Sequence, residues 1–299
     1  MGDVDEALSR AFARRPIPGL PGEVPPPPHG SRSPRGIEGR GVEQGRRRAV
    51  ELDRQRSGEP SSRIASRGLS RSAPAVEGPW GVGWEWANGP GLQLDWPEVV
   101  LVLEREVGER FERLADTLVE GRDRQGLRIV LATSCHRAEG RTTLVLALAR
   151  ALARRPGRTI LVDGDLTGPR LARTLGIGPG VGLDDVVEQS HAVEDAVLEA
   201  ADDHLWIAPL RAPVAAPRDF YASPRWSLVM ARLRREFDLV VIDGGPLFLG
   251  PGAAMVPRGV DAALLVRNRR LTGDPALLRA RAALEAGGVP LLGIAETFA

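Results

Sequence analysis

The sequence predicts an α/β fold, in which a doubly wound and mainly parallel sheet is covered by helices on both faces. From about residue 97 onward, short and continuous apolar runs alternate with segments of amphipathic helical spacing. Continuous apolar strands are typical of sheets buried on both faces, and alternation with helices is typical of parallel strands. Because aromatic residues make up only 4% of the 299 residues, we expect an aliphatic core.

The elements follow from the period of the apolar residues and from the turn residues between them. The first helix, for example, is predicted from the spacing of Val99, Leu103, Val107 and Phe111. The predicted elements are, in order, helix 98–120, strand 127–132, a helix from 144 to about 154, strand 158–162, helices 183–189 and 192–200, strand 204–208, helix 223–237, strands 239–242 and 261–266, helix 274–286 and strand 289–295.

The N-terminal part of the chain has a different composition. Between residue 16 and about residue 90, runs of proline and arginine lie among Gly, Ser and Glu, with few aliphatic residues. Such a segment cannot bury enough apolar surface to offset the entropy of ordering it. We therefore expect a disordered arm over residues 1–91, with one short amphipathic helix over 4–14, and a folded domain over residues 92–299.

Four tryptophans crowd the boundary between these two parts: Trp80, Trp84, Trp86 and Trp96. One interpretation is that this lead-in packs onto the folded domain and buries its rings. The other is that it forms a docking patch for a partner protein.

Composition excludes several function classes. The net charge of +1 does not favour nucleic acid as a partner. All 40 basic side chains counted as Lys and Arg are arginines, which excludes lysine chemistry. Cys135 is the single cysteine, so no disulfide can form within the chain, as is usual in the cytoplasm. The N-terminus does not resemble a signal peptide, and no apolar run is long enough for a membrane helix. We expect a cytoplasmic protein that is recruited to the inner face of the membrane only through a partner.

The segment Thr133–Thr143, TSCHRAEGRTT, joins a predicted strand to a predicted helix. A strand, a tight loop and a helix form the layout of a phosphate-binding loop, because free N–H groups at a helix start attract phosphate oxygens. Gly140 allows a tight turn, and the Thr142 hydroxyl suits a magnesium ion. The lysine that such loops carry is replaced here by Arg141. Cys135 and His136 are adjacent in this loop, but no third group is evident to orient them as a nucleophilic pair.

Three aspartates follow predicted strands: Asp163 and Asp165 come after one strand, and Asp243 comes after another. Carboxyl ends of parallel strands meet at one edge of the sheet, so these side chains should lie near the phosphate loop. One interpretation is that they serve magnesium, and the other is that they cap the turns that follow.

With these motifs in order, the chain from about residue 98 to its end resembles the bacterial tyrosine kinases. That family shares a deviant-Walker P-loop NTPase fold with MinD and ParA and serves capsule and exopolysaccharide export. Its loop reads TSxxPGxGK followed by Ser or Thr, and its later motifs correspond here to ILVDGDLTGPR at 160–170 and FDLVVIDGGP at 237–246. The segment LGIGPGVGLDDVV at 175–187 is also similar to a family motif.

The resemblance implies ATP and Mg²⁺ as cofactors and assigns residues by position. Asp163, Asp165 and Arg141 are the implied catalytic residues. Magnesium would be held by Thr142, Asp163 and Asp243. The implied nucleotide contacts are Arg137, Ala138, Glu139, Gly140, Arg141, Thr142, Thr143 and Arg267. The implied partner is a membrane-embedded polysaccharide chain-length or export protein, and the family also forms homo-oligomers.

The chain departs from the family at several positions. Arg141 replaces the loop lysine, and Arg137 and Ala138 replace Pro-Gly. Glu112 and Ala115 stand where the family's self-association helix carries arginines, which leaves ring formation in question. The family's tyrosine-rich tail is missing, and the single tyrosine, Tyr221, falls in a predicted loop.

We therefore expect an ATP-binding, kinase-like protein of exopolysaccharide or capsule export whose tyrosine-kinase activity is weakened or lost. The alternatives are a non-catalytic docking partner of an export complex and a MinD- or ParA-type positioning ATPase. The last class carries an additional early lysine in the loop, and residues 133–137 contain none.

Overall fold

The computed structural model describes residues 92–178, 180–248 and 254–297. The predicted arm, its helix over 4–14, and Trp80, Trp84 and Trp86 lie outside these residues. Trp96 is described, and it packs onto the domain. Its ring nitrogen donates to the Asp203 carboxylate at 2.8 Å, and the Arg150 guanidinium lies 4.6 Å from its ring centre. For this tryptophan the structure agrees with the first interpretation, a lead-in packed against the domain.

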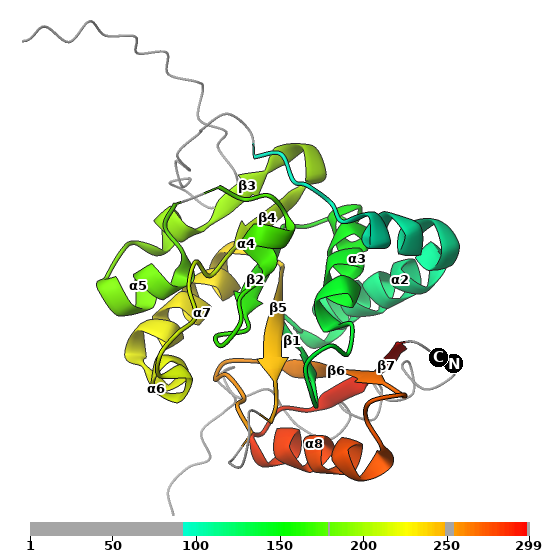
Figure 1. Cartoon of the computed structure of the whole chain (residues 1–299). Helices are drawn as coiled ribbons and strands as arrows, with labels where there is room; N and C mark the ends of the chain where they lie inside the picture. Colours follow the sequence, from blue (N-terminus) through cyan, green and yellow to red (C-terminus); the bar gives the residue numbers. More distant parts are fainter. Residues whose placement is uncertain (1–91, 179, 249–253, 298–299) are drawn as a thin grey trace, which may run out of the picture. The chain divides into compact units, whose positions relative to one another are not determined.

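The sheet is mainly parallel, as the sequence predicts. Its strand order is β3-β4-β2-β5-β1-β6-β7, and only β3 runs antiparallel to its neighbour (Figure 1). The strands are β1 (Ile129–Ser134), β2 (Thr159–Gly164), β3 (Leu198–Ala200), β4 (Leu205–Ala208), β5 (Leu239–Pro246), β6 (Ala262–Asn268) and β7 (Leu291–Thr297). The strand β1 is central, which places the loop after it in the middle of the sheet edge.

Helices cover both faces of the sheet (Figure 1). They are α2 (Glu98–Gln125), α3 (Arg141–Ala153), α4 (Leu171–Thr174), α5 (Leu183–Gln189), α6 (Pro217–Ala222), α7 (Pro224–Glu236) and α8 (Asp274–Ala286). The sheet separates two large hydrophobic cores, one with α2, α3 and α4 and the other with α5 to α8. Successive residues of β1 alternate between the cores, because strand side chains point to opposite faces. Ile129 and Leu131 belong to one core, and Val130 and Ala132 belong to the other.

One predicted helix is wrong. Residues 192–200 do not form a continuous helix, because Val193–Ala196 makes a single 3₁₀ turn and the chain then enters β3. Pairing with β4 prevails over the local helical preference, with Leu198 opposite Ile207 in an antiparallel register. The helix α6 was not predicted, although Pro217 stands at its start, where proline is tolerated. The first helix extends beyond the predicted residue 120 to Gln125, and Gly126 ends it with a φ of 71°.

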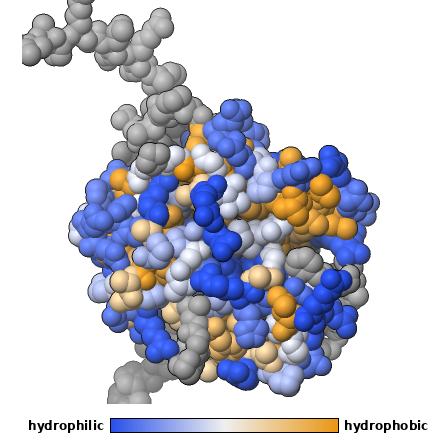
Figure 2. Space-filling model, in the orientation of Figure 1, coloured by the Kyte–Doolittle hydropathy of each residue, from blue (hydrophilic) through white to orange (hydrophobic). Residues whose placement is uncertain are grey.

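The surface shown in Figure 2 is hydrophilic in its middle, and an apolar area lies over α2. Two large apolar side chains of α2 are exposed, Val99 and Leu101. Among the described residues, no helix combines the length and the apolar character that a membrane span needs.

Candidate functional site

The sheet brings the predicted acidic residues to the loop. Asp163 of β2 pairs in register with Asp243 of β5, and Ala132 of β1 pairs with the same Asp243. The loop after β1 leads directly into α3, so it lies at these strand ends (Figure 1). The prediction that the strand-ending aspartates lie near the loop is therefore confirmed by the register of the parallel strands.

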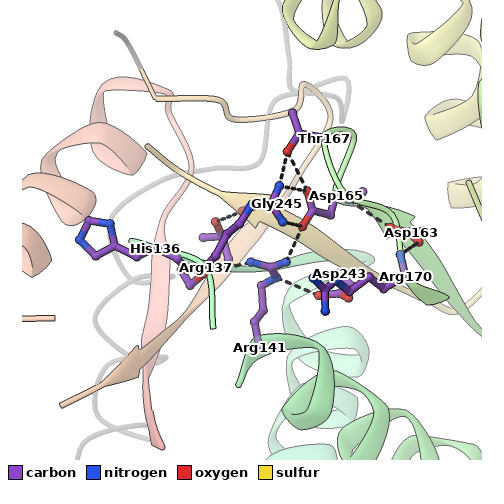
Figure 3. Close-up of polar contacts among 12 residues, drawn as sticks. His136, Arg137, Arg141, Asp163, Asp165, Thr167, Arg170, Asp243 and Gly245 are labelled. Atoms are coloured by element: carbon purple, nitrogen blue, oxygen red, sulfur yellow. Dashed lines mark hydrogen bonds and ion pairs between the residues drawn. The ribbon is translucent and has the colours of Figure 1, made fainter. Parts of the chain in front are cut away.

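Arg141 is the first residue of α3 and points into the acidic cluster (Figure 3). Its guanidinium donates to Asp243 Oδ1 at 2.9 Å, to Asp165 Oδ2 at 3.1 Å and to Ser134 Oγ at 3.0 Å. Only 8% of its side chain is exposed. Burial alone would lower the pKa of Arg141, but the charges of Asp243 and Asp165 raise it above its ordinary value. The guanidinium is thus a permanent cation that bridges both acidic motifs.

A second arginine binds Asp165 from the solvent side (Figure 3). Arg137 donates to the two oxygens of this carboxylate at 3.1 and 3.3 Å and to the Thr167 hydroxyl at 2.5 Å. Its side chain is 43% exposed. Gly168 lies against this guanidinium, since a Cβ there would be 2.8 Å from an Arg137 nitrogen. The Asp165 carboxylate is therefore shared between two guanidinium groups.

Asp163 holds the turn that follows β2. Its carboxylate accepts from the backbone N–H groups of Asp165 at 3.1 Å, of Arg170 at 3.1 Å and of Leu171 at 3.0 Å. Burial, and then the nearby charge of Asp243, raise the pKa of Asp163 to about 7. These contacts match the turn-capping interpretation of a strand-ending aspartate.

Asp243, like Asp163 and Asp165, is buried. Burial raises its pKa above the ordinary value, whereas the Arg141 charge and a hydrogen bond from the Thr142 hydroxyl act in the opposite direction. Thr142, the predicted magnesium ligand, therefore lies beside Asp243 in this arrangement.

Glu139, predicted as a nucleotide contact, instead anchors the loop to the β6–α8 connection, a role that the sequence did not reveal. Its carboxylate accepts from the backbone N–H of His136 at 2.7 Å, from the backbone N–H of Asn268 at 3.1 Å and from the Thr272 hydroxyl. Its side chain is buried. The Thr297 hydroxyl also donates to the Glu139 carbonyl at 2.7 Å, so the end of β7 contacts the same loop.

The structure places three other predicted nucleotide contacts, Gly140, Thr143 and Arg267, in different surroundings. Gly140 caps α3 with a φ of 80°, and Thr143 is half-buried in the first turn of that helix. Arg267 binds the β6–α8 connection, since its guanidinium donates to the Thr272 carbonyl at 3.0 Å and to Asp274 at 2.7 Å. The structure does not bring Arg267 together with Arg141 and the aspartates.

Ala138 takes a left-handed backbone conformation, with a φ of 61°. This is the position at which the family pattern has glycine, and an L-residue with a side chain pays about 1–2 kcal/mol for such a conformation. We expect Ala138→Gly to raise the free energy of unfolding by roughly 0.5–1 kcal/mol, because glycine removes the strain at some entropic cost. Urea denaturation measures the change. The control Ala282→Gly, at an exposed position of α8, should lose about 1 kcal/mol instead. A loss at both positions would contradict the strain at Ala138.

Cys135 and His136 do not form a catalytic pair. Cys135 is buried and donates to the Ala276 carbonyl at 3.5 Å, whereas His136 is exposed and points away from the acidic cluster (Figure 3). Burial, and then the charge of Glu139, raise the pKa of Cys135 to about 11.

Cys135 should therefore resist alkylation in the native protein. Only the thiolate reacts, and its population at pH 8 falls as the thiol pKa rises. We expect iodoacetamide to label the folded chain at least about tenfold more slowly than the urea-unfolded chain, as measured by mass spectrometry. Equal rates in both states would contradict the buried, neutral thiol.

Tyr221 does not lie in a loop, as predicted, but in α6, where it is buried. Its hydroxyl donates to the Gly164 carbonyl at 2.7 Å. Burial, and then the charge of Asp163, raise its pKa above the ordinary value. The single tyrosine of the chain thus supports the β2 strand end and does not present its hydroxyl to solvent.

The two departures in α2 have partners within this chain. Glu112 forms ion pairs with Arg154 and Arg155 at the end of α3, and Ala115 is fully buried. The positions where the family carries self-association arginines therefore contribute here to the contact between α2 and α3.

The acidic cluster does not fit a Mg²⁺ ion in this arrangement of side chains. Asp163 is bound by backbone N–H groups, and Asp165 and Asp243 are bound by guanidinium groups. Magnesium requires about six oxygen ligands in octahedral geometry, and it does not share them with a bridging cation. Among the residues that the structure describes, no group of three or more His, Cys, Asp and Glu side chains is placed to hold a metal ion.

Comparisons with known proteins agree with the resemblance. No protein-family model matches the chain. The tyrosine-protein kinase CpsD of Streptococcus pneumoniae is 26% identical over 173 residues, which cover 56% of this chain and 74% of CpsD. The VpsO kinase domain has a TM-score of 0.55 and 26% identity, over 65% of this chain and 98% of that domain. The kinase domain of the Escherichia coli tyrosine kinase ETK, at 19% identity, shares the fold, with a TM-score of 0.60 over 66% of this chain and 79% of ETK. The chain is related to bacterial tyrosine kinases and has the fold of their P-loop domains.

Proposed function

We propose that this chain, from its relation to bacterial tyrosine kinases, is an ATP-binding protein of capsule or exopolysaccharide export whose phosphotransfer activity is weakened or lost. The position of the loop between β1 and α3 supports nucleotide binding, because the first N–H groups of α3 have no partner within the helix. The proposed partner is a membrane-embedded polysaccharide export protein.

The observation that carries the loss of activity is the bridge from Arg141 to Asp165 and Asp243. A general base must be able to accept a proton, and a carboxylate bound to two guanidinium groups is a poor acceptor. Arginine is also longer and planar, so it does not place its charge as a lysine ammonium does. In P-loop and kinase sites, one well-placed cation changes the rate by about 10³-fold or more.

The test of binding is a calorimetric titration of the purified full-length chain with ATP in the presence of magnesium. Heat of binding that saturates at one nucleotide per chain is expected. No detectable binding would refute the proposal.

The test of catalysis compares the wild-type protein with Arg141→Lys in ATP hydrolysis and phosphotransfer. We expect the lysine variant to exceed the wild type by at least about tenfold, because a compact ammonium releases one of the two carboxylates. Equal activity in both proteins would mean that Arg141 is a working substitute. Circular dichroism of both proteins checks that the comparison is between folded chains.

A docking role is the second candidate, and the apolar area over α2 favours it (Figure 2). Val99 and Leu101 of this helix are exposed, and Trp96 shortly before it packs onto the domain. Replacing Val99 and Leu101 together with serine should then weaken capture of the export partner, whereas Asp163→Asn should leave capture unchanged. If capture instead required Asp163, the nucleotide site would be part of the interaction.

A further inference from the structure

The charges of Asp165 and Asp243 are already balanced without a metal ion. Asp165 and Asp243 face two permanent cations, Arg137 and Arg141, each of which donates to one or both carboxylates. A Mg²⁺ ion placed among these groups would add two positive charges to ion pairs that are already balanced. It would also need the oxygens that the guanidinium groups now occupy.

Arg141 also retains unused hydrogen-bond donors. A guanidinium has five N–H groups. Three of them donate to Asp243, Ser134 and Asp165, which leaves two without an acceptor among residues 92–178, 180–248 and 254–297. The side chain is 8% exposed, so these donors are held in a largely buried position at the start of α3. Arg137 is 43% exposed beside them and presents its outer edge to solvent.

We propose that this site binds nucleotide phosphates without a divalent cation, with the Arg141 guanidinium standing where a Mg²⁺ ion would be needed. The inference rests on the proposed nucleotide site. Arg141 stays bound to Asp165 and Asp243 and donates its remaining N–H groups to a phosphate oxygen. Arg137 adds a second cation at the mouth of the site. Guanidinium groups bind phosphate well, because their planar donors match its oxygens.

The experiment is a calorimetric titration of the full-length chain with ATP, performed once with excess magnesium and once with EDTA. We expect the two dissociation constants to agree within about threefold, because no carboxylate is open to the metal. In Arg141→Lys, the compact ammonium cannot bridge both carboxylates, so magnesium should tighten ATP binding by at least about tenfold. Thermal melts confirm that both proteins are folded.

The outcomes separate the two proposals. If magnesium tightens ATP binding to the wild-type chain by about tenfold or more, the inference fails while the proposed nucleotide site stands. If ATP binds under neither condition, both fail. If the wild-type chain and Arg141→Lys are equally indifferent to magnesium, the role given to Arg141 is overturned. A melting temperature of the wild-type chain that rises on addition of magnesium alone would also contradict the inference.

Discussion

Replacing Arg141 with methionine is expected to lower the free energy of unfolding by about 3–5 kcal/mol, because it leaves buried charges without a partner. Asp165 and Asp243 are both buried, and Arg141 is the cation that bridges them. Methionine fills a similar volume, so the loss reports the charge and not a cavity. Urea denaturation followed by circular dichroism measures the change.

Arg137→Met is the matched control, since Arg137 binds the same Asp165 carboxylate. Its side chain is 43% exposed, and ion pairs in contact with solvent contribute about 0–1 kcal/mol. We expect a loss within that range. Equal losses from the two methionine variants would show that the contribution of the Arg141 ion pairs to the free energy of unfolding does not depend on their burial.

Replacing Glu139 with alanine is also expected to lower the free energy of unfolding strongly. It removes the acceptor of three donors, the backbone N–H groups of His136 and Asn268 and the Thr272 hydroxyl. A buried donor left without an acceptor costs about 1–3 kcal/mol, so the total loss of unfolding free energy should reach about 3 kcal/mol or more. Urea denaturation again measures it, and the loop should become more open to proteolysis.

Glu285→Ala is the control for this change, because Glu285 is exposed and, within the part of the chain that the structure describes, its ion pair is with Arg281 one helical turn away. Such a pair contributes about 0.2–0.5 kcal/mol. The Glu139→Gln variant sharpens the test. Its amide retains one oxygen but turns a donor toward one of the three N–H or O–H groups, so its stability should fall between the wild type and alanine. Wild-type stability in Glu139→Gln would contradict the anchoring role.

Helices and strands whose formation depends on the local spacing of apolar residues could be predicted from the sequence. The bounds predicted for the helices at 183–189 and 274–286 agree with α5 and α8. The approach of Asp163 and Asp243 also followed from sequence, because parallel strands end at the same edge. The helix predicted over 192–200 failed at Leu198, where pairing with a strand from a later part of the chain decided the conformation.

The contacts within the site depend on distant parts of the chain. Arg141 reaches Asp243, which lies 102 residues further on, and Glu139 reaches Asn268, which lies 129 residues further on. The residues around the loop do not indicate in the sequence that Asp243 and Asn268 are these partners. The substitution of arginine for lysine was visible, but its bridge between two carboxylates required the register of β2 and β5.

The guanidinium at the start of α3 also decides which chemical proteomics methods can detect this chain. Acyl-phosphate derivatives of ATP tag nucleotide sites by transferring their acyl group to a neutral lysine amine. Here the corresponding group is Arg141, whose pKa is held above its ordinary value by Asp243 and Asp165 against the effect of burial. A guanidinium that never loses its proton is not a nucleophile. Such reagents should pass over this protein in a cell extract even when ATP is bound, so photoaffinity analogues of the nucleotide are the suitable alternative.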